Sequence, residues 1–443
     1  MGRRRKLPSE PFEVETGALD AKGAAAAQHD DRQLRVWGAL PGERVLARYL
    51  FGRRFRGQAE TVEVMEPAEG RVLPPCPSFG TCSACTLQHL SREAQLSFKQ
   101  ERLLALLDEQ LPGGALKPGR VLPPLDADRW NYRRKARLSV RAVKGKGRVL
   151  VGFRERDGRF VTDMQACHTL FTPVAEALPA LSELIGSLDA AATIPQIEAT
   201  CGDEATALVL RHLEPLSEAD LDRLKAFEAA TGFRWYLQPK GPETVAPLVP
   251  GPSRLRYALA DHALEFHFEP LDFVQVNQSL NEAMIAQALE LLSPGAGDRV
   301  LDLFCGLGNF TLPIARRVSA VVGLEGSFAL VQRAEENARD NDVDNARFAA
   351  VDLYGDTVDA AWPQGRFDAV LLDPPRSGAA PVLQRIADTG ADRVLYVSCN
   401  PETLASDAAE LVRGHGFRLA AAGAMDMFPQ TTHIEAMALF ERH

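Results

Sequence analysis

The stretch Val300-Leu301-Asp302-Leu303-Phe304-Cys305-Gly306-Leu307-Gly308-Asn309-Phe310 decides the fold of this chain. Its apolar start predicts a buried strand, and the two glycines predict a tight turn into a helix. Gly306 and Gly308 let the backbone approach a ligand closely. A nicotinamide-binding fingerprint requires a third Gly or Ala at position 311, where this chain has Thr311. Asp302, inside the motif, suits a cationic or hydroxylated ligand better than a pyrophosphate.

Strand patterns alternate with helical patterns around this stretch. We expect strands at 299–304, 320–324, 348–351, 367–373 and 393–398, followed by two closing strands at 417–424 and 434–440. The intervening helices are predicted at 280–292, 309–317, 328–341, 380–388 and 402–413. This alternation predicts an α/β fold, a Rossmann-like domain with a doubly wound, mostly parallel sheet.

Acidic residues stand at the ends of successive predicted strands. Glu325 lies roughly 20 residues after the glycine turn, where an acid commonly binds ribose hydroxyls. Asp352 ends the third strand and is suited to an adenine amino group. Together with Asp302 and the glycines, these acids favour S-adenosylmethionine as the ligand. A tight turn with solvated carboxylates is the alternative that a lone Gly-X-Gly would favour.

Three further motifs follow the later strands, and their key residues are Asp373, Cys399 and Glu435. Taken alone, Cys399 is more typical of a small core residue, and Glu435 of an ion-pair partner. Together they fit one reaction, the methylation of carbon 5 of uracil. A thiolate adds to carbon 6, carbon 5 takes a methyl group, and a carboxylate then removes the proton from carbon 5.

The motifs Gly306-X-Gly308, Asp373-Pro-Pro-Arg, Ser398-Cys-Asn-Pro and His433-X-Glu435 together resemble those of the RNA uracil-5 methyltransferases. The resemblance covers nearly the whole chain. It implies that Cys399 is the nucleophile and Glu435 the general base, and that Phe273 contacts the target base. It also implies S-adenosylmethionine contacts from Gln275, Phe304, Asn309, Glu325, Asp352 and Asp373.

The amino-terminal part predicts a small β-barrel, with strand-like runs at 13–15, 43–50 and 59–64. The segment Gly38-Ala39-Leu40-Pro41-Gly42-Glu43-Arg44-Val45 resembles the core of a TRAM domain, a small RNA-binding barrel. We therefore expect a TRAM barrel over 8–68, a central α+β domain over 69–264 and a methyltransferase domain over 265–443. Leucines near 3.6-residue spacing also predict an amphipathic helix from Ser91 to Leu111, and two further helices are expected near 174–187 and 217–230.

Cys76, Cys82 and Cys85 crowd together with C-x5-C-x2-C spacing, which indicates a metal site in a cytosolic protein. A fourth ligand is needed, and Cys167 and Cys201 are the candidates. Thiolates suit either zinc or an iron–sulfur cluster, and spacing does not separate the two. The family resemblance favours a [4Fe–4S] cluster with Cys167 as fourth ligand. Its expected role is structural, joining the segment after the barrel to the central domain.

The net charge of −9 argues weakly against a nucleic-acid binder, but the basic residues are clustered. The stretch Arg129–Arg148 carries nine Lys or Arg residues, with Trp130 and Tyr132 among them, and Arg44–Arg56 is a second basic stretch. These patterns predict either a solvated pair of charged strands or a track for RNA phosphates. Because the target carbon is hidden in stacked RNA, we expect the uridine to flip into the Cys399 pocket.

The barrel and the cysteine cluster together imply the branch of the family that modifies 23S ribosomal RNA. A transfer-RNA or dual-site uracil methyltransferase remains an alternative, as does a non-catalytic RNA-binding assembly factor. No apolar run reaches the roughly 18 residues of a membrane span. The charged start Met1–Lys6 has no apolar segment behind it, so we expect a cytoplasmic protein, and we expect a monomer.

Overall fold

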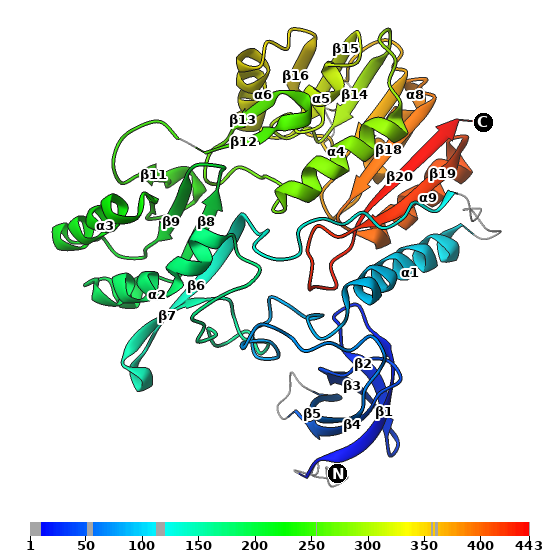
Figure 1. The fold of residues 1–443 in the computed structure, drawn as a ribbon. Coiled ribbons are helices and arrows are strands. Elements are labelled where there is room, and N and C mark those ends of the chain that lie inside the picture. Colours follow the sequence, from blue (N-terminus) through cyan, green and yellow to red (C-terminus); the bar gives the residue numbers. More distant parts are fainter. Residues whose placement is uncertain are drawn as a thin grey trace.

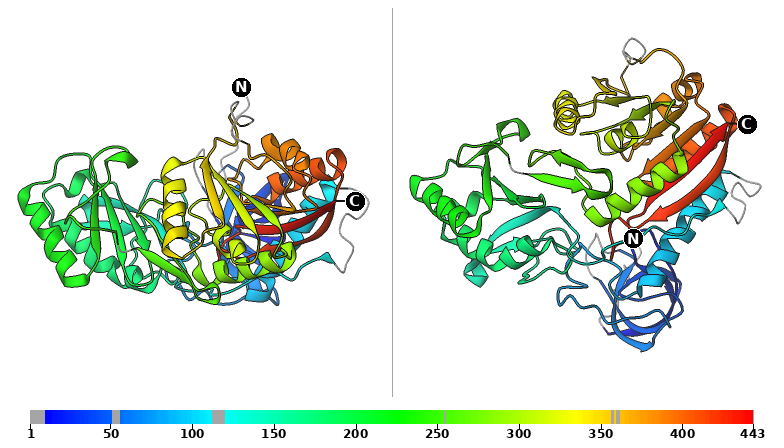
Figure 2. Two further views of the ribbon diagram at one scale, coloured as in Figure 1. Left: turned by 90° about the horizontal axis from the view of Figure 1, so that it is seen from above. Right: turned by 45° about the horizontal axis from the view of Figure 1, so that its top comes forward.

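The structure, a computed structural model, describes residues 10–50, 56–111, 120–253, 255–355, 358 and 362–442. Met1–Lys6, together with Arg53 and Arg54 of the second basic stretch, lies outside these residues. Figure 1 shows three bodies: an amino-terminal barrel, a central sheet flanked by helices, and a larger carboxy-terminal sheet. The second view in Figure 2 keeps the same three bodies apart.

The amino-terminal body is a closed barrel with strand order β1-β2-β3-β5-β4, which confirms the predicted small β-barrel. Its strands are β1 (Phe12–Leu19), β2 (Ala25–His29), β3 (Arg32–Trp37), β4 (Arg44–Tyr49) and β5 (Gln58–Glu66). The sequence analysis did not predict β2 and β3. Ala25 and Ala27 have little strand propensity of their own, and closure of the barrel buries them.

Helix α1 (Arg92–Gln110) confirms the predicted helix between residues 91 and 111. Ser91 caps it, since its side chain accepts a hydrogen bond from the Ala94 amide. Its buried stripe follows i, i+4 spacing and is half polar, unlike the all-leucine face that the periodicity predicted. The members of this stripe are Gln95, Lys99, Leu103 and Leu107.

The central body is a mixed sheet with strand order β11-β10-β9-β8-β6-β7. Its strands are β6 (Lys135–Val143), β7 (Arg148–Gly152), β8 (Gln196–Cys201), β9 (Thr206–Arg211), β10 (Arg234–Gln238) and β11 (Ala246–Pro247). Helices α2 (Thr172–Ser187) and α3 (Glu218–Thr231) lie where the sequence predicted helices. The basic stretch forms the antiparallel pair β6–β7.

The carboxy-terminal sheet has the order β16-β15-β14-β17-β18-β20-β19, and only the pairings of β20 are antiparallel, which confirms the predicted mostly parallel sheet. Its strands are β14 (Arg299–Leu303), β15 (Ala320–Glu325), β16 (Ala346–Ala350), β17 (Ala369–Leu372), β18 (Arg393–Ser398), β19 (Phe417–Met425) and β20 (Glu435–Arg442). The strand order reverses between β14 and β17, which is where ligands bind in such sheets.

Helices cover both faces of this sheet: α4 (Gln278–Leu292), α5 (Thr311–Ala315), α6 (Phe328–Asp340), α8 (Leu383–Asp388) and α9 (Pro401–Gly414). Alternate strand residues divide between two apolar cores, with Val300 facing α4 and Leu301 facing α8 and α9. Leu103 and Leu107 of α1 belong to the second core, so this early helix completes a layer of the late sheet (Figure 1).

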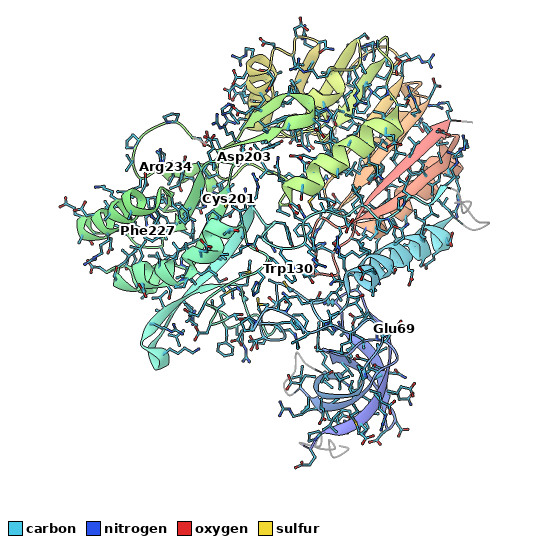
Figure 3. The ribbon with its side chains drawn as sticks, viewed as in Figure 1. Glu69, Trp130, Cys201, Asp203, Phe227 and Arg234 are labelled. Carbon is cyan, nitrogen blue, oxygen red and sulfur yellow. The ribbon has the colours of Figure 1, made fainter. Side chains whose placement is uncertain are left out.

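The central body meets the carboxy-terminal body at a small hairpin, β12 (Arg256–Leu259) and β13 (Leu264–His267). Asp203 lies at this joint (Figure 3), where its side chain accepts a hydrogen bond of 2.8 Å from the Ala258 amide. Within the described ranges, no helix is both long and apolar enough to cross a membrane.

Candidate active site

Residues predicted to bind the cofactor and to catalyse stand directly at or after the carboxyl ends of parallel strands. Glu325 ends β15, and Phe304, Asp352, Asp373 and Cys399 follow β14, β16, β17 and β18. Because parallel strands end at one edge of a sheet, five segments that are distant in sequence contribute to one rim. The structure thus places these predicted residues around the point where the strand order reverses.

The glycine turn forms an open cradle on this rim. Phe304 and Gly306 both adopt left-handed backbone conformations, with φ of 61° and 56°. A side chain at Gly306 would meet no atom within 4 Å, so its surface is free for a ligand. Its amide donates a 3.1 Å hydrogen bond to Glu325, whose other carboxylate oxygen accepts one of 2.9 Å from the Ser327 amide. The acid is therefore held against the turn.

A buried acid lies beneath the cradle. Asp302 is 1% exposed, and one of its oxygens accepts a 2.5 Å hydrogen bond from the Thr311 hydroxyl. Its other oxygen has no partner among the described residues. Burial, with contributions from Asp373 and Glu325, raises the pKa of Asp302 to about 7, and burial raises the pKa of Asp373 to about 7. A pocket with this surplus of acids fits a cationic ligand.

Gln275 and Asn309, two further residues predicted to contact the cofactor, both lie near Asn281. Asn309 exchanges hydrogen bonds of 2.8 and 3.0 Å with Asn281 and accepts one of 2.9 Å from the Tyr257 hydroxyl. Gln275 lines a small cavity together with Asn281 and Tyr257. The sequence predicted a helix from 309, but α5 begins at Thr311, which leaves the Asn309 side chain to this network.

Asp352 lies further out on the rim. Its side chain is exposed and accepts a 3.0 Å hydrogen bond from the Tyr354 amide. The Tyr354 ring stands 5.7 Å from the Phe304 ring, between centroids. The structure therefore links Asp352 to the glycine turn through an aromatic pair that the sequence analysis did not identify.

The register of the sheet brings the two predicted catalytic residues together. Ser398 of β18 pairs with Ala436 of β20, so Cys399 and Glu435 are the next residues toward the same edge. Glu435 is 9% exposed, and burial together with Asp373 raises its pKa well above the ordinary range. Burial, Glu435 and Asp373 raise the pKa of the Cys399 thiol to about 11.

Cys399 lines a cavity of about 260 Å³ that also contains Arg376, Asn400 and His433. The Arg376 guanidinium lies 2.6 Å from a ring nitrogen of His433, and burial and Arg376 lower the pKa of His433 to about 4. Asn400 donates a 2.9 Å hydrogen bond to the Arg376 carbonyl. Arg376 is the cation that opposes the acids around the thiol, a role that its position in the Asp-Pro-Pro-Arg motif did not reveal.

Four of the cysteines gather at the junction of the barrel and the central body. Burial raises the pKa of the thiols of Cys76, Cys82 and Cys85, to about 12 for Cys85, and Cys167 raises each of them further. Cys201 stands apart at the end of β8, where its neighbours are Thr206 and Arg134. In the described part of the chain, no group of three or more His, Cys, Asp or Glu side chains has the arrangement of a metal site.

Five of the nine cations of the basic stretch form ion pairs with three acids on the same surface. Its ion pairs are Arg134–Asp203, Lys135–Glu198, Arg137–Glu198, Lys146–Asp163 and Arg148–Asp163. Arg133 lies over the rings of Phe153 and Phe428. Arg129 and Arg141 are exposed, and neither forms an ion pair with another described residue. These two side chains are therefore the ones available to a phosphate.

Comparison with known proteins supports this geometry. Residues 254–443 match the family described as tRNA (Uracil-5-)-methyltransferase. The structure also superposes on that of the Pyrococcus abyssi tRNA (uracil-54, C5)-methyltransferase with a TM-score of 0.72, covering 97% of this chain and 100% of that one at 21% identity. This likeness shows the shared fold.

Sequence relatives extend over the whole chain. The 23S rRNA (uracil(1939)-C(5))-methyltransferase RlmD of Alkalilimnicola ehrlichii is 52% identical over 99% of this chain and 98% of its own length. The enzyme of the same name from Xanthomonas euvesicatoria is 48% identical over 99% of both chains. With identity of this level along its full length, the chain belongs to the RlmD family of S-adenosylmethionine-dependent RNA uracil-5 methyltransferases.

Proposed function

We propose that this protein methylates carbon 5 of one uridine in 23S ribosomal RNA. The observation that carries the proposal is the register of β18 and β20, which brings Cys399 and Glu435 to the same edge of the sheet, beside the acid-lined cradle. The ribosomal target is inferred from the relatives, which are named for it and which match this chain from end to end. The barrel, as a TRAM-type RNA-binding module, supports the same inference.

The proposed reaction begins at Cys399. Its thiolate adds to carbon 6 of the uracil, and the electron pair of the double bond then makes carbon 5 nucleophilic. S-adenosylmethionine supplies an electrophilic methyl group on a cationic sulfur. After methylation, Glu435 accepts the proton of carbon 5, the double bond re-forms, and the carbon 6–sulfur bond breaks with its electrons returning to Cys399.

The cofactor would be held by Gln275, Phe304, Asn309, Glu325, Asp352 and Asp373. The open face of Gly306 and the unpartnered oxygen of Asp302 support a polar, cationic ligand here. The positive charge of the cofactor would also help to activate the thiol, because burial, Glu435 and Asp373 oppose the ionisation of Cys399. A sulfonium in the pocket favours the thiolate.

For Cys76, Cys82, Cys85 and Cys167, we propose that they hold a [4Fe–4S] cluster with a structural role. The support is the set of possible ligands, because these four thiols lie close enough to affect one another's pKa. A thiol binds iron or zinc in its ionised form. Protein purified without oxygen is expected to contain about four irons per chain and to absorb visible light. Cys167→Ala is expected to lose both, whereas Cys201→Ala keeps both; a colourless protein with bound zinc would replace the cluster with a zinc site.

RNA recognition is proposed to involve the barrel together with Arg129 and Arg141, with the target uridine flipped into the cavity beside Cys399. Flipping is required because stacked RNA hides carbons 5 and 6. We infer further that the protein works as a monomer in the cytoplasm, where ribosomal RNA is modified. Its mass in solution, measured by light scattering, tests the oligomeric state.

The decisive experiment measures 5-methyluridine by mass spectrometry after incubating the protein with S-adenosylmethionine and either 23S ribosomal or transfer RNA transcripts. We expect one methylated uridine in 23S RNA and none in transfer RNA. Methylation of transfer RNA instead would identify a different member of the family. Binding of 23S RNA without methylation, equal for wild type and Cys399→Ala, would identify an assembly factor.

A further inference from the structure

The segment 426–434, which leads into Glu435, packs on its own domain through Met427 and Ile434 and is also held by helix α1. Gln430 is held in a left-handed conformation with φ of 69°. Its carbonyl accepts hydrogen bonds of 2.9 Å from the amides of Thr86 and Leu87, and its amide donates one of 3.0 Å to the Gln95 side chain. A residue of α1 thus supports a loop that lies more than three hundred positions later in the chain.

Lys99 is the charged member of the buried stripe of α1. It is 1% exposed, and its ammonium pairs with the fully buried carboxylate of Asp426. It also donates a 3.1 Å hydrogen bond to the Phe428 carbonyl. A buried lysine is strongly unfavourable unless it is paired or used, and the reaction assigned to this site does not yet use it.

The ion pair of Lys99 belongs to a network of two cations and two acids. Asp426 also pairs with Arg92, so one carboxylate is shared by two cations. Arg92 has a second acid partner in Asp126, at 3.0 Å. Burial and Arg92 lower the pKa of Lys99, which Glu435 raises, and Lys99 in turn lowers the pKa of Glu435, which burial and Asp373 raise.

The other charged groups around Glu435 are Asp373, Arg376 and Cys399. Asp373 and a Cys399 thiolate both oppose ionisation of Glu435. Arg376 lines the cavity beside Cys399, where the uracil would enter. Its positive charge opposes the effect of Glu435 and Asp373 on the pKa of the Cys399 thiol. Lys99 lies outside this cavity lining and is enclosed by α1 and the 426–434 segment.

Building on the proposed function, we propose that Lys99 is a positioning residue for the general base. It fixes the segment before Glu435 through Asp426 and the Phe428 carbonyl. The step that depends on it is the last one, in which the proton of carbon 5 passes to Glu435 and the carbon 6–sulfur bond breaks. Addition of Cys399 and methylation of carbon 5 do not require a base at Glu435.

The test is therefore the fate of the covalent RNA–protein adduct. In Lys99→Met, whose unbranched side chain is one heavy atom shorter, we expect methylated adduct to form and to decay about 10 to 100 times more slowly than in wild type. Denaturing gels with labelled RNA measure the adduct, and its methyl content is counted with labelled S-adenosylmethionine. We expect kcat to fall with little change in KM for RNA.

Asp426 keeps Arg92 as a partner in Lys99→Met, so the substitution does not leave a buried acid alone. Lys99→Gln is the second variant, because it keeps a hydrogen-bond donor for the Phe428 carbonyl and removes only the charge. The matched control is Gln100→Met on the same helix. The Gln100 side chain accepts a 2.8 Å hydrogen bond from the Ala424 amide in β19, and it is not among the groups that shift the pKa of Glu435.

Lys99→Met and Lys99→Gln should both accumulate adduct, and Gln100→Met should not, even if its free energy of unfolding falls as much. Adduct decay at the wild-type rate in either folded Lys99 variant would overturn the proposal, as would equal accumulation in Gln100→Met. Glu435→Gln provides the maximum accumulation and Cys399→Ala the absence of adduct. If wild type itself forms no 5-methyluridine, the proposed function fails rather than the role of Lys99.

Discussion

At the scale of single residues, the site is electrostatically unfavourable without its cofactor. Burial raises the pKa values of Asp302, Asp373 and Glu435, and Asp373 adds to the effect at the other two. Cys399 stands beside two of them, which keeps its thiol protonated. Such perturbed groups cluster where a protein binds charge or transfers protons.

Reactivity of Cys399 should therefore depend on the cofactor. With a pKa of about 11, only about one thiol in a thousand is ionised at pH 8. We expect iodoacetamide to modify Cys399 slowly at pH 8 and faster as the pH rises. S-adenosylmethionine should accelerate the modification at pH 8, whereas S-adenosylhomocysteine, whose sulfur is neutral, should not. Peptide mass spectrometry separates Cys399 from the other thiols, and equal rates with both ligands would contradict the electrostatic explanation.

Removal of the base should stop the reaction after methylation. Glu435→Gln keeps the shape of the side chain but accepts no proton, so we expect turnover to fall about 10²- to 10⁴-fold. A methylated RNA adduct that survives denaturation should accumulate instead. An adduct without the methyl group would show that Glu435 acts before methyl transfer.

Asp302 should lower stability above neutral pH. Its folded pKa of about 7 exceeds its ordinary value of 3.8, so the folded state holds the proton more tightly than the unfolded state. The free energy of unfolding therefore falls as the pH rises from 3.8 to about 7, and it stays reduced at higher pH. Asp302→Asn should be more stable than wild type by about 1 to 3 kcal/mol at pH 8, with a smaller difference at pH 5. Urea denaturation at both pH values measures the difference in stability, and an equal difference at the two pH values would contradict this explanation. The affinity of Asp302→Asn for S-adenosylmethionine should also be lower than that of wild type.

At the scale of elements, the barrel touches the site through one turn. Gly23, between β1 and β2, has φ of 84°. A side chain there would lie 3.2 Å from Thr86 and 3.2 Å from Thr432, which belongs to the 426–434 segment. The turn therefore packs where the segment that carries Cys76, Cys82 and Cys85 meets the 426–434 segment. The sequence analysis placed these residues in separate domains, and their contact depends on the tertiary fold.

Gly23→Val should displace the barrel and weaken RNA methylation. Gly42→Val is the matched control, since Gly42 also has a positive φ, of 77°, but no atom within 4 Å of an added side chain. Both variants should lose about 1 to 2 kcal/mol from backbone strain. Only Gly23→Val should also raise KM for RNA and expose the segment around Thr432 to proteases. Equal KM values in the two variants would contradict a docking role for this turn.

At the scale of the whole molecule, RNA must bind to a chain whose net charge is −9. Most of the basic stretch is already paired with acids, which reduces the number of cations that can replace counterions on RNA. Arg129 and Arg141 remain exposed. The density of positive charge in the sequence therefore overstates the strength of the RNA-binding surface.

Salt dependence measures this difference. Arg141→Ala should reduce the slope of log affinity against log salt by about 0.7 to 0.9, the value of one phosphate contact. Arg137→Ala, which removes a cation paired with Glu198 at 3.2 Å, should change the slope much less. Fluorescence anisotropy with a 23S RNA fragment provides the slopes, and equal changes in both variants would show that the ion pairs open on binding.

The sequence by itself determined the strand–turn–helix around Gly306 and the mostly parallel sheet, and it singled out Cys399 and Glu435 as candidates for one site. These features depend on local periodicity and on chemistry that few residue types can perform. Only the tertiary structure decided the buried Lys99–Asp426 pair, the Arg376–His433 contact and the ion pairs of the basic stretch. Each of these joins residues far apart in the chain, and the energy of a buried charge depends on its neighbours in space, which no local pattern encodes.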